Sequence, residues 1–126
     1  MKVISVSENK KIEKRIAITP DVAKKYINLG FEVCLPENYG THLGISDNEF
    51  KESGVKIIIE ENELINKADI IVQVGLLNEE RLSLIKENQS YIGILDLHNN
   101  KKKIENIVKK KINFFSLELL PRITRA

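Results

Sequence analysis

The stretch Ala68-Asp69-Ile70-Ile71-Val72-Gln73-Val74 is the segment of this sequence that decides the fold. It is a nearly continuous run of β-branched residues, which is typical of a strand covered on both faces. Strands of this kind belong to sheets with helices packed on each side. The segment therefore predicts an α/β protein.

Outward from this segment, strand and helix signals alternate along the whole chain. Five further strands are expected at residues 2–7, 31–35, 55–59, 91–95 and 113–119. Helices are expected between them at residues 20–29, 46–54, 61–67, 79–86 and 100–111. Thr19 and Ser46 are the expected N-caps of the first two helices, and Gly30 and Gly54 are their expected stops. This order predicts a three-layer, flavodoxin/Rossmann-like α/β domain with a mainly parallel sheet, spanning residues 1–126.

Composition excludes several classes of protein. The chain has 126 residues, 42% hydrophobic and 30% charged, with a net charge of +2, so it forms one domain with its own core. A single cysteine, Cys34, excludes a disulfide framework and a multi-thiolate metal site. No apolar run is long enough for a signal peptide or a membrane span, so a soluble protein of a reducing compartment is expected. The lysines at 101–103 and 109–111 indicate a solvated helix face rather than a nucleic-acid site.

Ligands of parallel α/β sheets bind outside the carboxyl ends of the strands, so the loops there hold the candidate residues. Arg15 follows the first strand and could clamp a carboxylate or brace Glu8 or Glu13; both interpretations stay open. Arg122 and Arg125 follow the last strand and could meet a phosphate or a cofactor amide, or form a solvated basic tail. Neither a G-x-G-x-x-G fingerprint nor a Walker sequence occurs, so no dinucleotide phosphate cradle is expected. His42 and His98 lack metal-ligand spacing and are expected at the surface.

The motifs together resemble the N-terminal domain shared by alanine dehydrogenases and the alpha subunit of proton-translocating NAD(P) transhydrogenase. The resemblance spans the chain and rests on Arg15-Ile16-Ala17-Ile18-Thr19-Pro20, Leu29-Gly30-Phe31-Glu32-Val33, Gly40, Ser46-Asp47, Gly54 and the strand at 68–74. The final segment, Glu118-Leu119-Leu120-Pro121-Arg122-Ile123-Thr124-Arg125-Ala126, is similar to the transhydrogenase alpha subunit and not to alanine dehydrogenase.

Two departures favour the transhydrogenase side of this resemblance. Gly75 stands where alanine dehydrogenases carry a substrate-binding lysine, and Asp96 stands where they carry a catalytic histidine. Hydride exchange between two nicotinamides needs no group that protonates a carbon substrate, so these losses are compatible with it. His98 lies two residues beyond and is not expected to replace the histidine.

The resemblance implies a function and a set of partners. It implies a Re/Si-specific transhydrogenase, in which hydride passes from NADH to NADP⁺ on the beta subunit, coupled to proton translocation. Arg122 is implied beside the nicotinamide of NAD(H), Arg125 more weakly, while Arg15 is expected to be structural. The assembly would be a homo-oligomer at the cytoplasmic face of the inner membrane, reaching the membrane only through partner segments, with no metal and no nucleic acid.

The chain is expected to supply one wall of the NAD(H) cleft, because the glycine-rich fingerprint would belong to a following Rossmann domain. We therefore expect residues 1–126 alone to be inactive and to bind NAD(H) weakly or not at all. Two alternatives remain: the N-terminal domain of an alanine or saccharopine dehydrogenase-like enzyme, and a non-catalytic interaction module.

Overall fold

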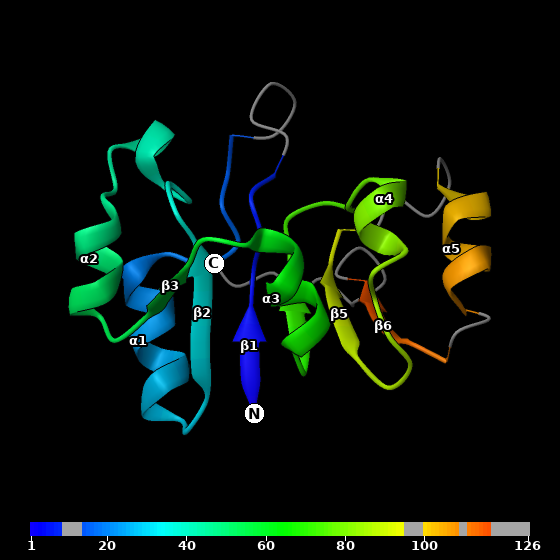
Figure 1. The fold of residues 1–126 in the computed structure, drawn as a ribbon, viewed down its shortest axis with the longest axis horizontal. Helices are drawn as coiled ribbons and strands as arrows, with labels where there is room; N and C mark the ends of the chain where they lie inside the picture. Colours follow the sequence, from blue (N-terminus) through cyan, green and yellow to red (C-terminus); the bar gives the residue numbers. More distant parts are fainter. Residues whose placement is uncertain (9–13, 95–99, 109–110, 117–126) are drawn as a thin grey trace, which may run out of the picture.

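The computed structural model describes residues 1–8, 14–94, 100–108 and 111–116, and its centre is a parallel sheet of six strands (Figure 1). The strands are β1 (Lys2–Ile4), β2 (Glu32–Pro36), β3 (Lys56–Ile58), β4 (Ile70–Val72), β5 (Ser90–Gly93) and β6 (Asn113–Ser116). Their spatial order is β3-β2-β1-β4-β5-β6, and every neighbouring pair is parallel. Of the two common doubly wound orders, this is the Rossmann order, whose direction reverses between β1 and β4.

The helices lie where the sequence predicts them. They are α1 (Pro20–Asn28), α2 (Asp47–Glu52), α3 (Glu61–Lys67), α4 (Glu79–Leu82) and α5 (Lys101–Val108). The side chain of Thr19 accepts a hydrogen bond from Val22 N at 3.3 Å, and that of Ser46 accepts one from Glu49 N at 3.3 Å. Both expected N-caps are therefore confirmed, since each satisfies a donor that the first helical turn leaves open. None of the described helices has the length and apolarity to cross a bilayer.

Three local features differ from the sequence prediction. The paired part of the strand at 68–74 is only Ile70–Val72, and a short 3₁₀ helix, Thr41–Leu43, lies in the loop expected at 36–44. Helix α4 ends at Leu82, before the predicted end at residue 86. Beyond it the chain continues in tighter i→i−3 turns, because Leu84 N and Ile85 N donate to Arg81 O and Leu82 O at 3.1 and 3.2 Å.

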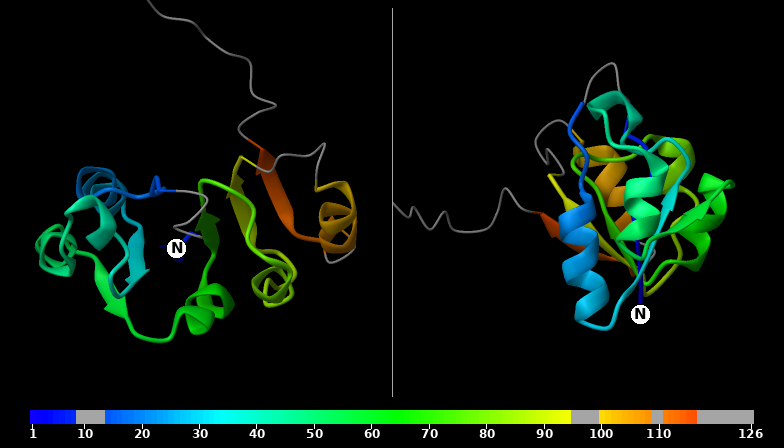
Figure 2. Two further views of the ribbon diagram at one scale, coloured as in Figure 1. Left: turned by 90° about the horizontal axis from the view of Figure 1, so that it is seen from above. Right: turned by 90° about the vertical axis from the view of Figure 1, so that its left-hand side faces the viewer.

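Two hydrophobic cores cover the two faces of the sheet, and they differ in extent (Figure 2). The core beside α3, α4 and α5 takes residues from all six strands, including the buried Ile4, Ile71 and Tyr91. The core beside α1 and α2 centres on the buried Leu35 and Phe50 and takes side chains from β1 to β4 only. The half of the sheet formed by β1, β2 and β3 is therefore packed on both faces, as buried parallel strands require.

Candidate functional site

The candidate site lies at the carboxyl ends of β1 and β4, where the strand order reverses. Open α/β sheets bind ligands in the crevice outside such a reversal, because the loops of the two neighbouring strands turn to opposite faces. Ser5 follows β1 and Gln73 follows β4, and both side chains are buried. We call Ser5, Glu8, Tyr39, Gln73 and Gly75 the switch-point network.

Gln73 is the centre of the switch-point network, and its side-chain amide uses its full hydrogen-bonding capacity. Its Oε1 accepts from Val6 N at 2.7 Å and from Ser5 Oγ at 2.9 Å. Its Nε2 donates to Val6 O at 3.1 Å and to the Glu8 carboxylate. With two acceptor and two donor interactions made, the orientation of the amide is determined, and the side chain joins β1 to β4 beyond the backbone ladder.

Tyr39 extends the switch-point network to the loop that carries Arg15. Its hydroxyl accepts from Ala17 N at 3.1 Å and from Ile18 N at 3.3 Å, and it lies 2.7 Å from Ser5 Oγ. Since Ser5 donates its only hydroxyl proton to Gln73, Tyr39 donates to Ser5. Burial raises the pKa of Tyr39 to about 12, so this donor keeps its proton at physiological pH.

Glu8 closes the other end of the switch-point network. One carboxylate oxygen accepts from Gly75 N at 3.0 Å, and the other accepts from the Gln73 amide. On the next strand, Tyr91 donates to Gly75 O at 2.5 Å and accepts from Leu77 N at 3.2 Å. Burial raises the pKa of Tyr91 well above its ordinary value. The loop after β4 is thus held by a carboxylate on one side and a neutral phenol on the other.

A half-buried ion pair lies beside this network. Arg81 Nη2 is 2.8 Å from Glu61 Oε2, with side-chain exposures of 24% and 26%. Arg81 Nη1 also donates to Ser7 O at 3.0 Å, and Ser7 Oγ donates to Glu61 at 3.3 Å. This pair ties the first turns of α3 and α4 to the segment that leaves β1.

The residues predicted from the sequence fall in two groups. Arg15 is exposed in the loop that Tyr39 holds, and its brace with Glu8 or Glu13 stays a prediction, with Glu13 outside the described residues. Arg122 and Arg125 also lie outside them, as do Asp96 and His98.

Two lesser expectations are confirmed. His42 is exposed, and its ring nitrogen lies 2.7 Å from Lys14 O. Cys34 is a buried free thiol in β2.

Sequence reasoning missed most of the switch-point network. A signal for two of its members was present, because Ser5 and Gln73 are single polar residues near the carboxyl ends of strands whose other residues are mostly apolar. A polar side chain in such a place is buried and needs hydrogen-bond partners. Tyr39 carries no comparable signal, since its partners are far away in the sequence.

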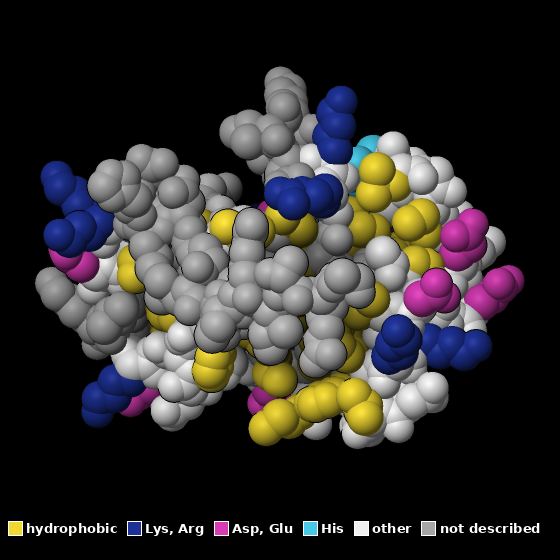
Figure 3. Space-filling view, turned by 180° about the vertical axis from the view of Figure 1, so that it is seen from behind, with side chains coloured by type: hydrophobic (Ala, Val, Ile, Leu, Met, Phe, Trp, Pro, Cys, Tyr) yellow, Lys and Arg dark blue, Asp and Glu magenta, His cyan; other side chains and the backbone are white. Residues whose placement is uncertain are grey.

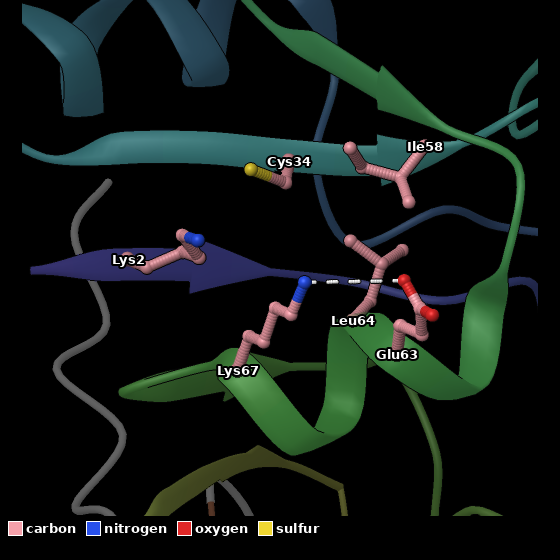
Figure 4. Close-up of a pocket in the computed structure, with 6 residues that line it drawn as sticks. All are labelled: Lys2, Cys34, Ile58, Glu63, Leu64 and Lys67. Carbon is pink, nitrogen blue, oxygen red and sulfur yellow. Dashed lines mark ion pairs between the residues drawn. The ribbon is translucent and has the colours of Figure 1, made fainter.

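A shallow cavity of about 100 Å³ lies elsewhere, beside α3 (Figure 4). Its lining joins an apolar floor to charged groups at its rim: Lys2, Cys34, Ile58, Glu63, Leu64 and Lys67. Lys67 and Glu63 are 3.9 Å apart, and burial raises the pKa of the Cys34 thiol, which lowers its reactivity. This cavity lacks the convergent polar groups of the switch-point network, and within the described ranges no His, Cys, Asp and Glu side chains gather as a metal site.

Chemically, the switch-point network is suited to positioning. Both phenols stay neutral, and the Gln73 amide cannot titrate, so these groups hold two loops in register rather than move protons. The edge offers one wall of a crevice with hydrogen-bonding backbone and a half-buried carboxylate, Glu8.

Comparison with known proteins places this arrangement in a family. The family model described as "Alanine dehydrogenase/PNT, N-terminal domain" matches residues 5–126. The chain is 34% identical over 131 residues to the first of the polypeptides that make up NAD(P) transhydrogenase subunit alpha of Rhodospirillum rubrum, covering 100% of this chain and 34% of the relative. It is 35% identical over 130 residues to the protein of the same name from Rickettsia prowazekii, again with 100% and 34% covered. Alanine dehydrogenase 1 of Staphylococcus aureus is 29% identical over 120 residues, with 95% and 32% covered.

Solved structures show the same likeness. A transhydrogenase from Sinorhizobium meliloti matches with a TM-score of 0.90 and 27% identity, covering 98% of this chain and 37% of that one. An L-alanine dehydrogenase shares the fold with a TM-score of 0.85 at 16% identity, over 92% and 32% of the two chains. The chain spans about a third of the length of the curated relatives it matches. On its sequence and its fold, this chain belongs to the alanine dehydrogenase/PNT N-terminal domain family.

Proposed function

We propose that residues 1–126 form the N-terminal domain of an NAD(P) transhydrogenase alpha subunit and supply one wall of its NAD(H) cleft. The subunit would pass hydride from NADH to NADP⁺ bound by a beta subunit, coupled to proton translocation. The observation that carries this proposal is similarity over the whole chain to two transhydrogenase alpha polypeptides, at 34% and 35% identity.

The geometry of the switch-point network supports the same reaction. Hydride transfer between two nicotinamides needs fixed rings and little water, and it needs no side chain that protonates a substrate. Here Gly75 presents only its backbone, and its N–H is held by Glu8 at 3.0 Å. A Cβ at Gly75 would meet Glu8 Oε1 at 3.6 Å, an ordinary contact, so the backbone does not demand glycine. A missing side chain at this position is therefore consistent with chemistry that does not use one.

The nucleotide contacts follow from this proposal. Arg122 would lie beside the nicotinamide and donate to its carboxamide, and Arg125 would contribute less. Arg15 would keep its loop in place, in keeping with the two N–H groups of that loop that donate to Tyr39. Pyrophosphate would be held by a glycine-rich turn of a neighbouring Rossmann domain, since residues 1–126 contain no such fingerprint. The assembly would be a homo-oligomer at the cytoplasmic face of the membrane.

The second candidate is an alanine dehydrogenase-like enzyme. It is supported by the 29% identity to alanine dehydrogenase 1 over 120 residues. The two candidates differ in substrate: one oxidises an amino acid, and the other exchanges hydride between dinucleotides.

The test uses the intact subunit that contains residues 1–126, together with its beta partner. We expect NADPH to reduce an NAD⁺ analogue, followed by absorbance, and alanine to leave NAD⁺ unreduced. Reduction of NAD⁺ by alanine without exchange would establish the second candidate. Intact subunit that binds no NADH in calorimetry would instead indicate an interaction module.

A matched pair of variants tests the site residues. Arg122→Ala is expected to raise the Kd for NADH about tenfold, because a charge-assisted hydrogen bond contributes about 1.5–3 kcal/mol. Arg125→Ala removes the same charge three residues away and is expected to change the Kd less than about twofold. Equal effects of the two variants would contradict the assigned contact and indicate general electrostatic attraction.

A further inference from the structure

The sheet has one apolar face that the two cores leave uncovered. Across β4, β5 and β6, residues Val72, Ile92 and Phe115 are direct neighbours in the strand register. Ile94 continues the row beyond β5, where its N–H donates to Val74 O at 2.9 Å. We call Val72, Ile92, Ile94 and Phe115 the open face.

Alternation along the strands shows on which side the open face lies. Tyr91 and Phe114 pack into the core beside α3, α4 and α5, so their neighbours Ile92 and Phe115 point to the opposite side, which carries α1. Figure 3 looks onto that side and shows apolar side chains surfacing over the middle and lower portion of the molecule. Among the described residues, the core on this side takes none from β5 or β6.

The exposure of this row is large for a parallel sheet. Phe115 is 57% exposed and Ile94 is 40% exposed, although both continue a surface that starts under the α1 core at Val72. Parallel sheets in α/β proteins have both faces covered by helices, because each strand carries apolar side chains on both sides. The open face therefore lacks the layer that α1 supplies to the other half of the sheet.

We propose that the open face is the docking site for an apolar helix from the portion of the alpha polypeptide outside residues 1–126. The proposal rests on the proposed function, since it takes the chain as one segment of a longer subunit. Relatives that match the whole chain are about three times its length, so two thirds of such a polypeptide could provide the helix.

The size of the open face favours a tethered helix over a second copy of the chain. Phe115 and Ile94 together expose on the order of 200 Å². A stable dimer between free proteins buries about 800 Å² on each partner. A segment of the same polypeptide needs far less area, because the tether supplies a high effective concentration. An amphipathic helix with one apolar stripe has the shape and chemistry to cover a single row of side chains.

Photo-cross-linking in the intact subunit tests this proposal. Phe115 is replaced with p-benzoylphenylalanine, and Leu29, which is 74% exposed at the end of α1, is replaced in the same way as a control. We expect the probe at position 115 to form an adduct within the same polypeptide, on the apolar side of one helix beyond residue 126. The probe at position 29 is expected to leave that helix unlabelled.

Mixing isotopically heavy and light subunits separates the possible occupants. An adduct that joins heavy to light alpha chains would overturn the proposal in favour of a second copy, and an adduct with the beta subunit or no adduct at position 115 would also overturn it. A Phe115→Asp variant provides a second readout, with an expected fall in the Tm of the intact subunit that Leu29→Asp does not reproduce. NADH binding is measured on the same samples, so failure of the proposed function appears as lost binding while the cross-link remains readable.

Discussion

The two halves of the sheet are built differently. The half formed by β1, β2 and β3 is packed between two apolar cores, and Phe50 at 0% exposure is typical of its interior. In the half formed by β4, β5 and β6, one face carries a core and the other presents Phe115 at 57% exposure. The difference shows that apolar burial stabilises the first half within this chain, whereas the second half depends more on polar hydrogen bonds and on a covering element.

The largest effect is expected from truncating the two phenylalanines that represent these halves. Phe50→Ala should lower the free energy of unfolding by about 3–5 kcal/mol, because it leaves a cavity in a closed core. Phe115→Ala should lower it by less than about 1 kcal/mol in the 126-residue chain. Urea unfolding followed by circular dichroism measures both, since the chain has no tryptophan. Similar losses for the two variants would mean that the second half is as closed as the first.

A second pair of substitutions tests how tightly β5 approaches the site. A Cβ at Gly93 would lie 2.7 Å from Gln73 O, which is backbone and cannot move away cheaply. Gly93→Ala should therefore cost about 2–3 kcal/mol through overpacking. At Gly75 the nearest atom to a new Cβ is 3.6 Å away, so Gly75→Ala should cost less than about 1 kcal/mol. Thermal unfolding of the two variants checks this order, and a larger loss at Gly75 would contradict the geometry.

The third prediction concerns the junction of the two halves. Gln73→Leu removes the amide that satisfies Val6 N, Ser5 Oγ and Glu8, and buried groups left without partners should cost about 2 kcal/mol. Amide hydrogen exchange should also speed up at Ala17 and Ile18, which the network reaches through Tyr39.

Gln89→Leu is the matched control for this variant, because Gln89 is also buried and donates to Ile65 O and Ala68 O at 2.6 and 2.8 Å. It should cost a similar amount without changing exchange at Ala17. Unchanged exchange in Gln73→Leu would show that the network does not couple the two loops.

The smallest effect is a pH dependence that Tyr39 contributes. Its pKa is raised to about 12, so the folded protein keeps the phenolic proton to higher pH than the unfolded chain, where the pKa is near 10. This contribution is complete below about pH 10 and is lost as pH rises from about 10 to 12, at about 1.4 kcal/mol per pH unit. Tyr39→Phe should therefore show a shallower loss of stability in this window. Parallel curves for the two proteins would indicate that Tyr39 titrates alike in both states.

The order of elements could be predicted from the sequence because it depends on local signals. The β-branched run at 68–74 and the caps Thr19 and Ser46 specify strands and helix starts from residues within a few positions of one another. Arg15 could be placed in a loop at the carboxyl edge of the sheet for the same reason. The identity of Gln73 was readable as well, although its partners were not.

The sequence by itself determined the α/β class, the parallel sheet, the positions of its helices and the family resemblance. The tertiary structure alone decided the strand order β3-β2-β1-β4-β5-β6, the switch-point network and the open face. The physical reason is the distance along the chain: Ser5 and Gln73 are 68 residues apart, and Ser5 and Tyr39 are 34 apart. Contacts of that span depend on which strands become neighbours, and only the folded sheet brings those strands together.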